Sequence, residues 1–210
     1  MTGQIGRIFY SIAVFIISIF ARGFFRIKIT GAENIPLSGG VIIAANHISY
    51  LDIPLLSYSI NRHADFVGKK QLFTIPVLGS LFRLLGGIPI DRDKVDRTAL
   101  REIVRRLNSG KIIVIYPEGT RSPDGRLQPG KPGVGFIVRM SGKKVVPTAI
   151  SGTDKAMPSG SWFIRPRPVT IRFGKPLDFS IGSGFLTRKG ADSRITEEIM
   201  GKIADLLEAG

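Results

Sequence analysis

The chain has 210 residues, 43% of them hydrophobic, and contains no cysteine. This length is enough for one domain with a sizeable core, and the lack of cysteine excludes disulfides, a thiolate nucleophile and cysteine-ligated metals. Lys and Arg number 30 against 16 Asp and Glu, so the net charge of +14 favours an anionic partner such as nucleic acid, an anionic membrane or an acidic protein.

The first predicted element is an apolar helix over residues 3–21. Residues 8–21 read IFYSIAVFIISIFA and carry no charge, but they are shorter than the roughly 20 residues that a membrane span needs. Arginines and phenylalanines follow at 22–26, a mixture typical of the headgroup level of a bilayer. We interpret residues 1–24 as a helix that dips into an anionic membrane surface. A signal peptide and a buried core helix are the alternatives.

Residues 25–210 are predicted to form one domain in which strands and helices alternate. Strands are expected at 25–30, 41–45, 65–68, 88–90, 112–116, 145–151 and 169–173, and helices at 53–59, 76–85, 94–108, 132–141 and 194–208. This alternation predicts an α/β fold with a mostly parallel or mixed central sheet flanked by helices. In such folds, functional side chains gather beyond the carboxyl ends of strands.

His47 and Asp52 follow the strand 41–45 in the segment NHISYLD. Their five-residue offset turns the side chains about 140° apart on an α-helix, so they meet only if a turn precedes the helix. Pro54 indicates a helix start close to Asp52. The two side chains then match a general base and its orienting carboxylate, without a protein nucleophile. An Asp52 N-cap beside a polar strand end fits equally well from the residues alone.

The other histidine, His63, lies in the polar loop NRHAD and is predicted to be a surface residue. Two histidines and no cysteine are too few for the usual zinc ligand sets, so we expect no metal.

Cations and hydroxyls follow several other predicted strands or a nearby turn. The segment YPEGTRS, residues 116–122, supplies Gly119 for a tight turn and Thr120 and Arg121 as donors. Further cations in comparable positions are Lys69, Arg92 and Lys131. Because guanidinium binds phosphate bidentately, the repeated placement predicts an anion site near His47. Any single one of these cations is also explained as a solvated surface residue.

Four segments, NHISYLD with its HX4D spacing, GIPIDR, YPEGTRS and VVPTAI, resemble in this order the motif blocks of the glycerolipid acyltransferases. The resemblance covers about residues 25–173 and is strongest to the bacterial 1-acyl-sn-glycerol-3-phosphate (lysophosphatidic acid) acyltransferases. It implies that His47 is the catalytic base and Asp52 its partner. It also implies that Arg92, Glu118, Gly119 and Arg121 bind the glycerol phosphate end of the acceptor. Tyr116 replaces a frequent Phe and is not expected to touch the chemistry.

The implied reaction transfers a fatty acyl group from an acyl thioester to the sn-2 hydroxyl of lysophosphatidic acid, giving phosphatidic acid for phospholipid biosynthesis. It implies no cofactor, because acyl carrier protein or coenzyme A carries the thioester as co-substrate, and no nucleic acid. The implied location is the cytoplasmic face of a bacterial inner membrane, in a monotopic or peripheral arrangement. The alternatives are an acyltransferase with glycerol-3-phosphate or another lysolipid as acceptor, a non-catalytic basic protein that binds membranes or nucleic acid, and a thioesterase.

Overall fold

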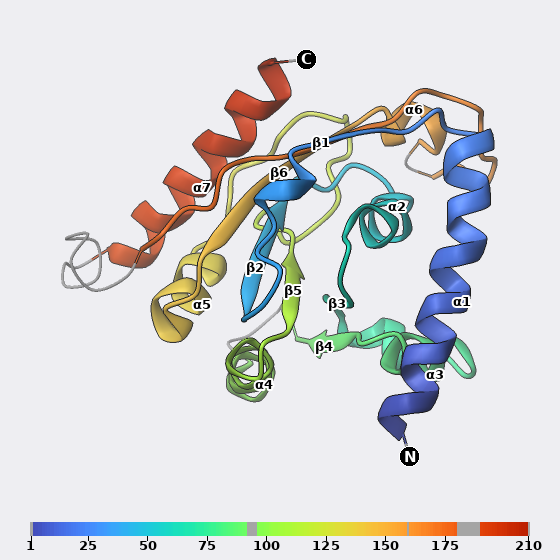
Figure 1. The fold of residues 1–210 in the computed structure, drawn as a ribbon. Helices are drawn as coiled ribbons and strands as arrows, with labels where there is room; N and C mark the ends of the chain where they lie inside the picture. Colours follow the sequence, from blue (N-terminus) through green and yellow to red (C-terminus); the bar gives the residue numbers. More distant parts are fainter. Residues whose placement is uncertain (1, 92–95, 159, 180–189, 210) are drawn as a thin grey trace.

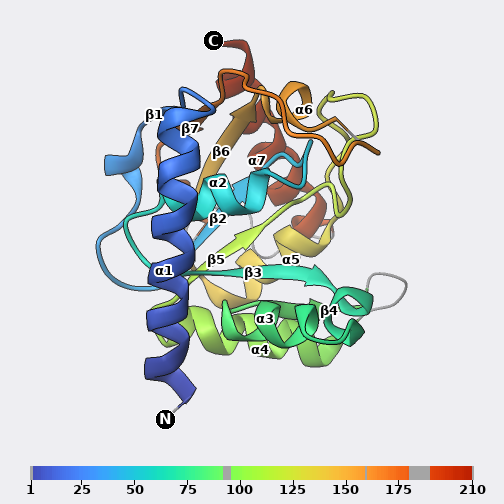
Figure 2. The same ribbon diagram turned by 90° about the vertical axis from the view of Figure 1, so that its right-hand side faces the viewer.

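A seven-stranded sheet lies at the centre of the computed structural model, with helices on both of its faces (Figures 1 and 2). The structure describes residues 2–91, 96–158, 160–179 and 190–209. The strands are Lys28–Thr30 (β1), Val41–Ala45 (β2), Ala64–Lys69 (β3), Ile88–Ile90 (β4), Ile112–Ile115 (β5), Val145–Ser151 (β6) and Thr170–Phe173 (β7). The helices are Thr2–Gly23 (α1), Asp52–Ser59 (α2), Leu78–Leu84 (α3), Arg97–Asn108 (α4), Gly133–Ser141 (α5), Thr153–Ala156 (α6) and Ala191–Glu208 (α7).

The strand order is β1-β7-β6-β2-β5-β3-β4, and every neighbouring pair is parallel except β6 and β7. The predicted α/β fold with a mostly parallel sheet is therefore confirmed, and all seven predicted strands are present. The four-residue helix α6 and two short 3₁₀ turns, Ala32–Asn34 and Lys70–Thr74, were not predicted. Elements this short contain too few residues to show a periodic pattern.

The two central strands have buried side chains on both faces of the sheet. β2 reads VIIAA and β5 reads IIVI, and all of these residues are buried, as expected for parallel strands covered on both sides. On one face Ile43 and Val114 pack with α1 and α2. On the other face Ile42 and Ile113 pack with α4, α5 and α7. Strands β2 and β5 themselves therefore carry no polar side chain, and the polar groups next to them come from the loops that follow.

Helix α1 is apolar on two opposite sides. Ile17 and Ala21 pack against the core of the domain. The outward face carries large apolar side chains that are 49% to 67% exposed: Ile8, Phe9, Ile12, Phe15, Ile16, Ile19 and Phe20. Within the described ranges, no helix combines the length and the apolar character needed to cross a bilayer. The expected membrane-dipping helix thus exists as a helix, and its contact with a membrane stays a prediction, as does the boundary between residues 24 and 25.

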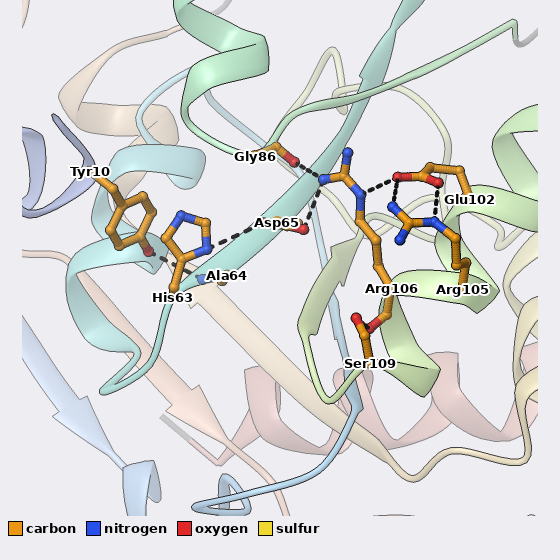
Figure 3. A network of polar contacts seen from close by, with 9 residues as sticks. All are labelled: Tyr10, His63, Ala64, Asp65, Gly86, Glu102, Arg105, Arg106 and Ser109. Carbon is orange, nitrogen blue, oxygen red and sulfur yellow. Dashed lines mark hydrogen bonds and ion pairs between the residues drawn. The ribbon is translucent and has the colours of Figure 1, made fainter. Parts of the chain in front are cut away.

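A polar network joins α1, β3 and α4 at the amino end of the sheet (Figure 3). Asp65 of β3 accepts a hydrogen bond from Arg106 of α4 (2.8 Å), and its other oxygen lies 3.3 Å from His63 Nδ1. The His63 ring packs against Tyr10 of α1 with a centroid distance of 4.0 Å, and only 21% of the His63 side chain is exposed. The prediction of His63 as a surface residue is wrong because α1 covers it.

Candidate active site

Residues 46–51 form a tight loop between the carboxyl end of β2 and the start of α2. Asp52 Oδ2 lies 2.8 Å from His47 Nδ1 and also accepts hydrogen bonds from the backbone N–H groups of Ile48 (2.7 Å) and Ser49 (2.8 Å). Because these donors precede Asp52, the carboxylate closes the turn and does not cap α2. The N-cap interpretation is therefore wrong, and the predicted turn that brings His47 to Asp52 is confirmed.

The second oxygen of Asp52 accepts a hydrogen bond from the Thr153 hydroxyl at 2.6 Å, and Asp52 is fully buried. Imidazole, hydroxyl and two backbone amides together stabilise this buried carboxylate, which would otherwise be costly to desolvate. A carboxylate only accepts, so His47 Nδ1 donates to it and Nε2 is left as the acceptor. This arrangement suits a base that removes a proton from a hydroxyl.

Sequence reasoning missed Thr153, which begins α6 at a separation of 101 residues from Asp52. The one available signal was its position just beyond the strand 145–151, where a parallel strand adjacent to β2 ends. Neither its residue type nor a spacing rule links it to HX4D.

Glu118 holds the backbone of the loop that carries His47. Its Oε1 accepts from the His47 backbone N–H at 2.7 Å, its Oε2 accepts from the Gln128 N–H at 3.0 Å, and it is 2% exposed. Burial raises the pKa of the Glu118 carboxyl, the two backbone hydrogen bonds oppose that rise, and the nearby charge of Asp52 adds to it. These contacts give Glu118 a positioning role that the resemblance did not imply, and its contact with glycerol phosphate stays a prediction.

Tyr116 packs against the imidazole ring of His47. Its ring stacks on the His47 imidazole with a centroid distance of 4.0 Å and an interplanar angle of 17°. Its hydroxyl is buried without a hydrogen-bond partner among the described residues. Burial raises the Tyr116 pKa well above its ordinary value, and the charge of Asp52 adds to the rise. Tyr116 therefore contacts His47, and whether it takes part in the chemistry stays a prediction.

Four of the predicted anion-binding residues, Gly119, Thr120, Arg121 and Lys131, lie in the loop between β5 and α5, and Lys69 is the last residue of β3. The Arg121 guanidinium lies 3.4 Å from the centroid of the Tyr50 ring, a cation–π contact. Gly119 adopts φ +71°, and the side chain of Lys131 lies over it, 3.1 Å from where a Cβ would be. Thr120 and Lys69 are exposed. Arg92 lies outside the described residues.

An apolar cavity of about 220 Å³ lies between α1, α2, β3 and α3. Its wall includes Ile53, the residue after Asp52, together with Ile17, Phe66 and Phe73. A second cavity, of about 540 Å³, lies on the other face of the sheet beside Gly119 and Lys131. The first cavity reaches the site through Ile53 of α2, whereas Tyr116 lines the second cavity. No sequence pattern revealed either apolar neighbour of the site.

A profile of the protein family described as Acyltransferase matches residues 26–151, more than half of the chain. The chain belongs to the acyltransferase family. The matched segment of this acyltransferase contains His47, Asp52, Glu118 and Arg121, and it ends two residues before Thr153.

Several relatives of this acyltransferase are named 1-acyl-sn-glycerol-3-phosphate acyltransferase. The chloroplastic 1-acyl-sn-glycerol-3-phosphate acyltransferase LPAT1 of Arabidopsis thaliana is 37% identical over 143 residues, which make up 66% of this chain and 39% of the relative. A 1-acyl-sn-glycerol-3-phosphate acyltransferase of Bacillus subtilis is 27% identical and aligns over 86% of this chain and 87% of its own.

The fold has a solved counterpart. The crystal structure of the 1-acyl-sn-glycerophosphate acyltransferase PlsC from Thermotoga maritima is similar with a TM-score of 0.77 and 28% identity, covering 100% of this chain and 82% of that one. The chain thus spans about two fifths of the Arabidopsis relative and most of the two bacterial ones.

Proposed function

We propose that this acyltransferase moves a fatty acyl group from an acyl thioester to the sn-2 hydroxyl of 1-acyl-sn-glycerol-3-phosphate and forms phosphatidic acid. The observation that carries the proposal is the buried His47–Asp52 pair, whose 2.8 Å contact leaves the second imidazole nitrogen as the proton acceptor. The names of the plant and bacterial relatives support the same acceptor. The reaction needs no cofactor beyond the thioester itself.

In the proposed reaction His47 Nε2 removes the proton from the sn-2 hydroxyl while the oxygen attacks the thioester carbonyl carbon. The tetrahedral intermediate collapses, the carbon–sulfur bond breaks, and the thiolate takes the proton back from His47. Asp52 stabilises the transient imidazolium. A positioned general base contributes about 10²–10⁴-fold to such a rate, and Glu118 and Tyr116 keep the ring of His47 in place for it.

The phosphate of the acceptor is proposed to bind the cations at this edge of the sheet. Arg121 and Lys131 are the nearest candidates on the loops that follow β5, and Lys69 ends the neighbouring strand β3. Gly119 and Thr120 offer a turn and a hydroxyl beside them, and Arg92 belongs to the same proposal from the sequence. Arginine and lysine side chains are the usual phosphate ligands where no metal is involved.

An acyl chain is proposed to lie in the apolar cavity beside α2, since that cavity touches Ile53 and runs under α1. The outward face of α1 is proposed to rest in the surface of an anionic membrane, because seven large apolar side chains there are 49% to 67% exposed. A peripheral position on the cytoplasmic side of a bacterial inner membrane, with acyl carrier protein or coenzyme A as the donor, completes the proposal.

Product analysis by mass spectrometry tests this function. Purified full-length protein receives oleoyl-lysophosphatidic acid with palmitoyl-acyl carrier protein or with palmitoyl-coenzyme A, and parallel reactions contain glycerol-3-phosphate or a neutral lysolipid. We expect palmitoyl-oleoyl phosphatidic acid from lysophosphatidic acid, and the faster donor identifies the physiological thioester class. Product from glycerol-3-phosphate or the neutral lysolipid alone would assign a different acceptor, and absence of any acylated product would contradict the proposal.

A further inference from the structure

Residues 160–168, an irregular loop between α6 and β7, expose three consecutive large apolar side chains. Trp162, Phe163 and Ile164 are 87%, 81% and 47% exposed, and Trp162 is the one tryptophan of the chain. Single exposed apolar residues need no explanation, but a contiguous group of them marks a contact with a protein or a membrane.

The backbone of this loop is fixed although its apolar side chains protrude. The Arg165 N–H donates to the carbonyl of Ala156 at 2.8 Å, which ties the middle of the loop to α6. The Ser161 hydroxyl accepts a hydrogen bond from the Phe163 N–H at 3.1 Å. The Ser161 backbone N–H donates to the Pro158 carbonyl at 3.0 Å. The loop therefore holds its apolar residues outward in a defined geometry.

Cations flank these apolar residues in the sequence. Lys155, Arg165 and Arg167 are exposed, and the segment 155–177 contains no acidic residue. Tryptophan and phenylalanine next to arginine are suited to the boundary between headgroups and acyl chains, where rings lie at the interface and cations meet lipid phosphates. Charge complementarity thus favours an anionic bilayer.

The loop is attached to the end of the membrane-facing helix. The N–H of Val169, the residue after the loop, donates to the carbonyl of Phe25 at 3.1 Å, and Lys28 donates to the carbonyl of Val169 at 2.9 Å. Figure 1 shows α1 and the segment around α6 on the same side of the molecule. The apolar loop and α1 therefore lie on the same side of the molecule, joined through Phe25 and Val169.

We propose that residues 161–167 form a second membrane contact, which inserts Trp162, Phe163 and Ile164 at the headgroup level of an anionic bilayer while Arg165 and Arg167 bind lipid phosphates. Two separate contacts, α1 and this loop, fix the orientation of the protein on the surface. The loop leaves α6, whose first residue Thr153 holds Asp52. The contact thereby keeps the catalytic pair close to the membrane, and the contact itself does not depend on the proposed reaction.

The emission of Trp162 tests the contact directly. Full-length protein is mixed with vesicles of equal parts phosphatidylglycerol and phosphatidylcholine, and with vesicles of phosphatidylcholine alone. Anionic vesicles are expected to shift the emission to shorter wavelength and to reduce quenching by acrylamide at least threefold. Neutral vesicles should have a smaller effect, and brominated lipids labelled near the headgroup should quench Trp162.

Two sets of variants separate the loop from α1. Arg165→Ser with Arg167→Ser keeps Trp162 and should weaken partitioning into anionic vesicles about 30-fold, from about 1 kcal/mol for each cation. Trp162→Ser with Phe163→Ser should weaken co-sedimentation with either vesicle type. Leu37→Ser is the matched apolar control, since Leu37 is also 87% exposed, and Arg101→Ser on α4 is the cation control. Both controls should partition as the wild type does.

Sedimentation with anionic vesicles while Trp162 keeps its unbound emission and full quencher access would overturn the proposal, since α1 alone would then make the contact. A blue shift produced by an acidic carrier protein and not by anionic vesicles would overturn it in favour of a protein partner. Acylation activity is not a readout here, so failure of this contact and failure of the proposed reaction are distinguishable.

Discussion

Two histidine–aspartate pairs lie at opposite ends of the parallel strands, and only one has the contacts of a catalytic base. His47 and Asp52 lie beyond the carboxyl end of β2, with a 2.8 Å hydrogen bond and an aspartate satisfied by uncharged donors besides the imidazole. His63 and Asp65 lie at the amino end of β3, 3.3 Å apart, and Asp65 already pairs with the guanidinium of Arg106.

The difference lies in what balances the carboxylate. Arg106 gives Asp65 a permanent cationic partner besides His63. At Asp52 the imidazole of His47 is the one ionisable donor among the four contacts. The same two residue types therefore connect α1 to α4 in one place and form the proposed general base in the other.

The largest expected effect separates the two histidines. His47→Ala should lower the rate of phosphatidic acid formation by about 10³-fold, because the reaction loses its general base. His63→Ala should change the rate by less than about threefold. The measurement is initial rate under saturating substrates, with circular dichroism to verify that both variants are folded. Near wild-type turnover of His47→Ala would contradict the assignment of His47 as the general base.

The two aspartates give the next contrast. Asp52→Asn should lower kcat by about 10²–10⁴-fold, because an amide favours the wrong imidazole tautomer. Asp65→Asn should leave kcat nearly unchanged and lower the melting temperature by about 5 °C, because Arg106 loses one of its two carboxylate partners inside the network. Steady-state kinetics and thermal unfolding of both variants check this. Equal losses of kcat would mean that the pairs are not functionally different.

Substitution of Thr153 tests how much the hydrogen bond to Asp52 contributes to kcat. Thr153→Val removes the 2.6 Å hydrogen bond to Asp52 and should lower kcat about tenfold with little change in the KM for lysophosphatidic acid, since it acts through Asp52. Thr153→Ser should restore most of the rate. The matched control is Thr148→Val, a buried threonine whose hydroxyl bonds to the Val146 carbonyl. A similar loss in that control would show that packing alone is responsible.

The smallest effect concerns acid stability at the second pair. Burial raises the pKa of Asp65, but His63 and Arg106 outweigh burial and lower it below its usual 3.8. Hydrogen bonds from Arg105 lower the pKa of Glu102 to about 2. Partial burial opposes this shift, and Arg106 adds to it. As the pH falls, these two carboxyl groups are protonated in the unfolded chain before they are protonated in the folded protein. Their contribution to the free energy of unfolding is therefore complete above about pH 5 and is lost as the pH falls toward 2.

Urea midpoints measured between pH 5 and pH 2 check that loss. Asp65→Asn should show a shallower decline than the wild type, because one of the depressed carboxyl groups is missing. Asp205→Asn, which removes an exposed pair with Lys202, is the matched control and should follow the wild type, since exposed pairs contribute little. Parallel declines of Asp65→Asn and the wild type would contradict the assigned role of the network.

Much of the fold could be predicted from the sequence because its strands and helices follow from local residue patterns. VIIAA and IIVI are continuous apolar runs, and their length and branched residues predicted buried parallel strands that the structure contains. HX4D was readable too, since Pro54 indicated the helix start that forces a turn between His47 and Asp52. The short helix α6 was not readable, because four residues carry no periodicity.

The sequence by itself determined the succession of strands along the chain and the residue types that follow each strand. It also determined the spacing that lets the His47 imidazole reach the Asp52 carboxylate. Only the tertiary structure decided which distant groups complete the site: Thr153 on Asp52, Glu118 on the His47 backbone and Tyr116 under the ring. The physical reason is that register and strand order bring these residues together. Contacts across 71 and 101 residues depend on how a sheet is assembled, which no local pattern encodes.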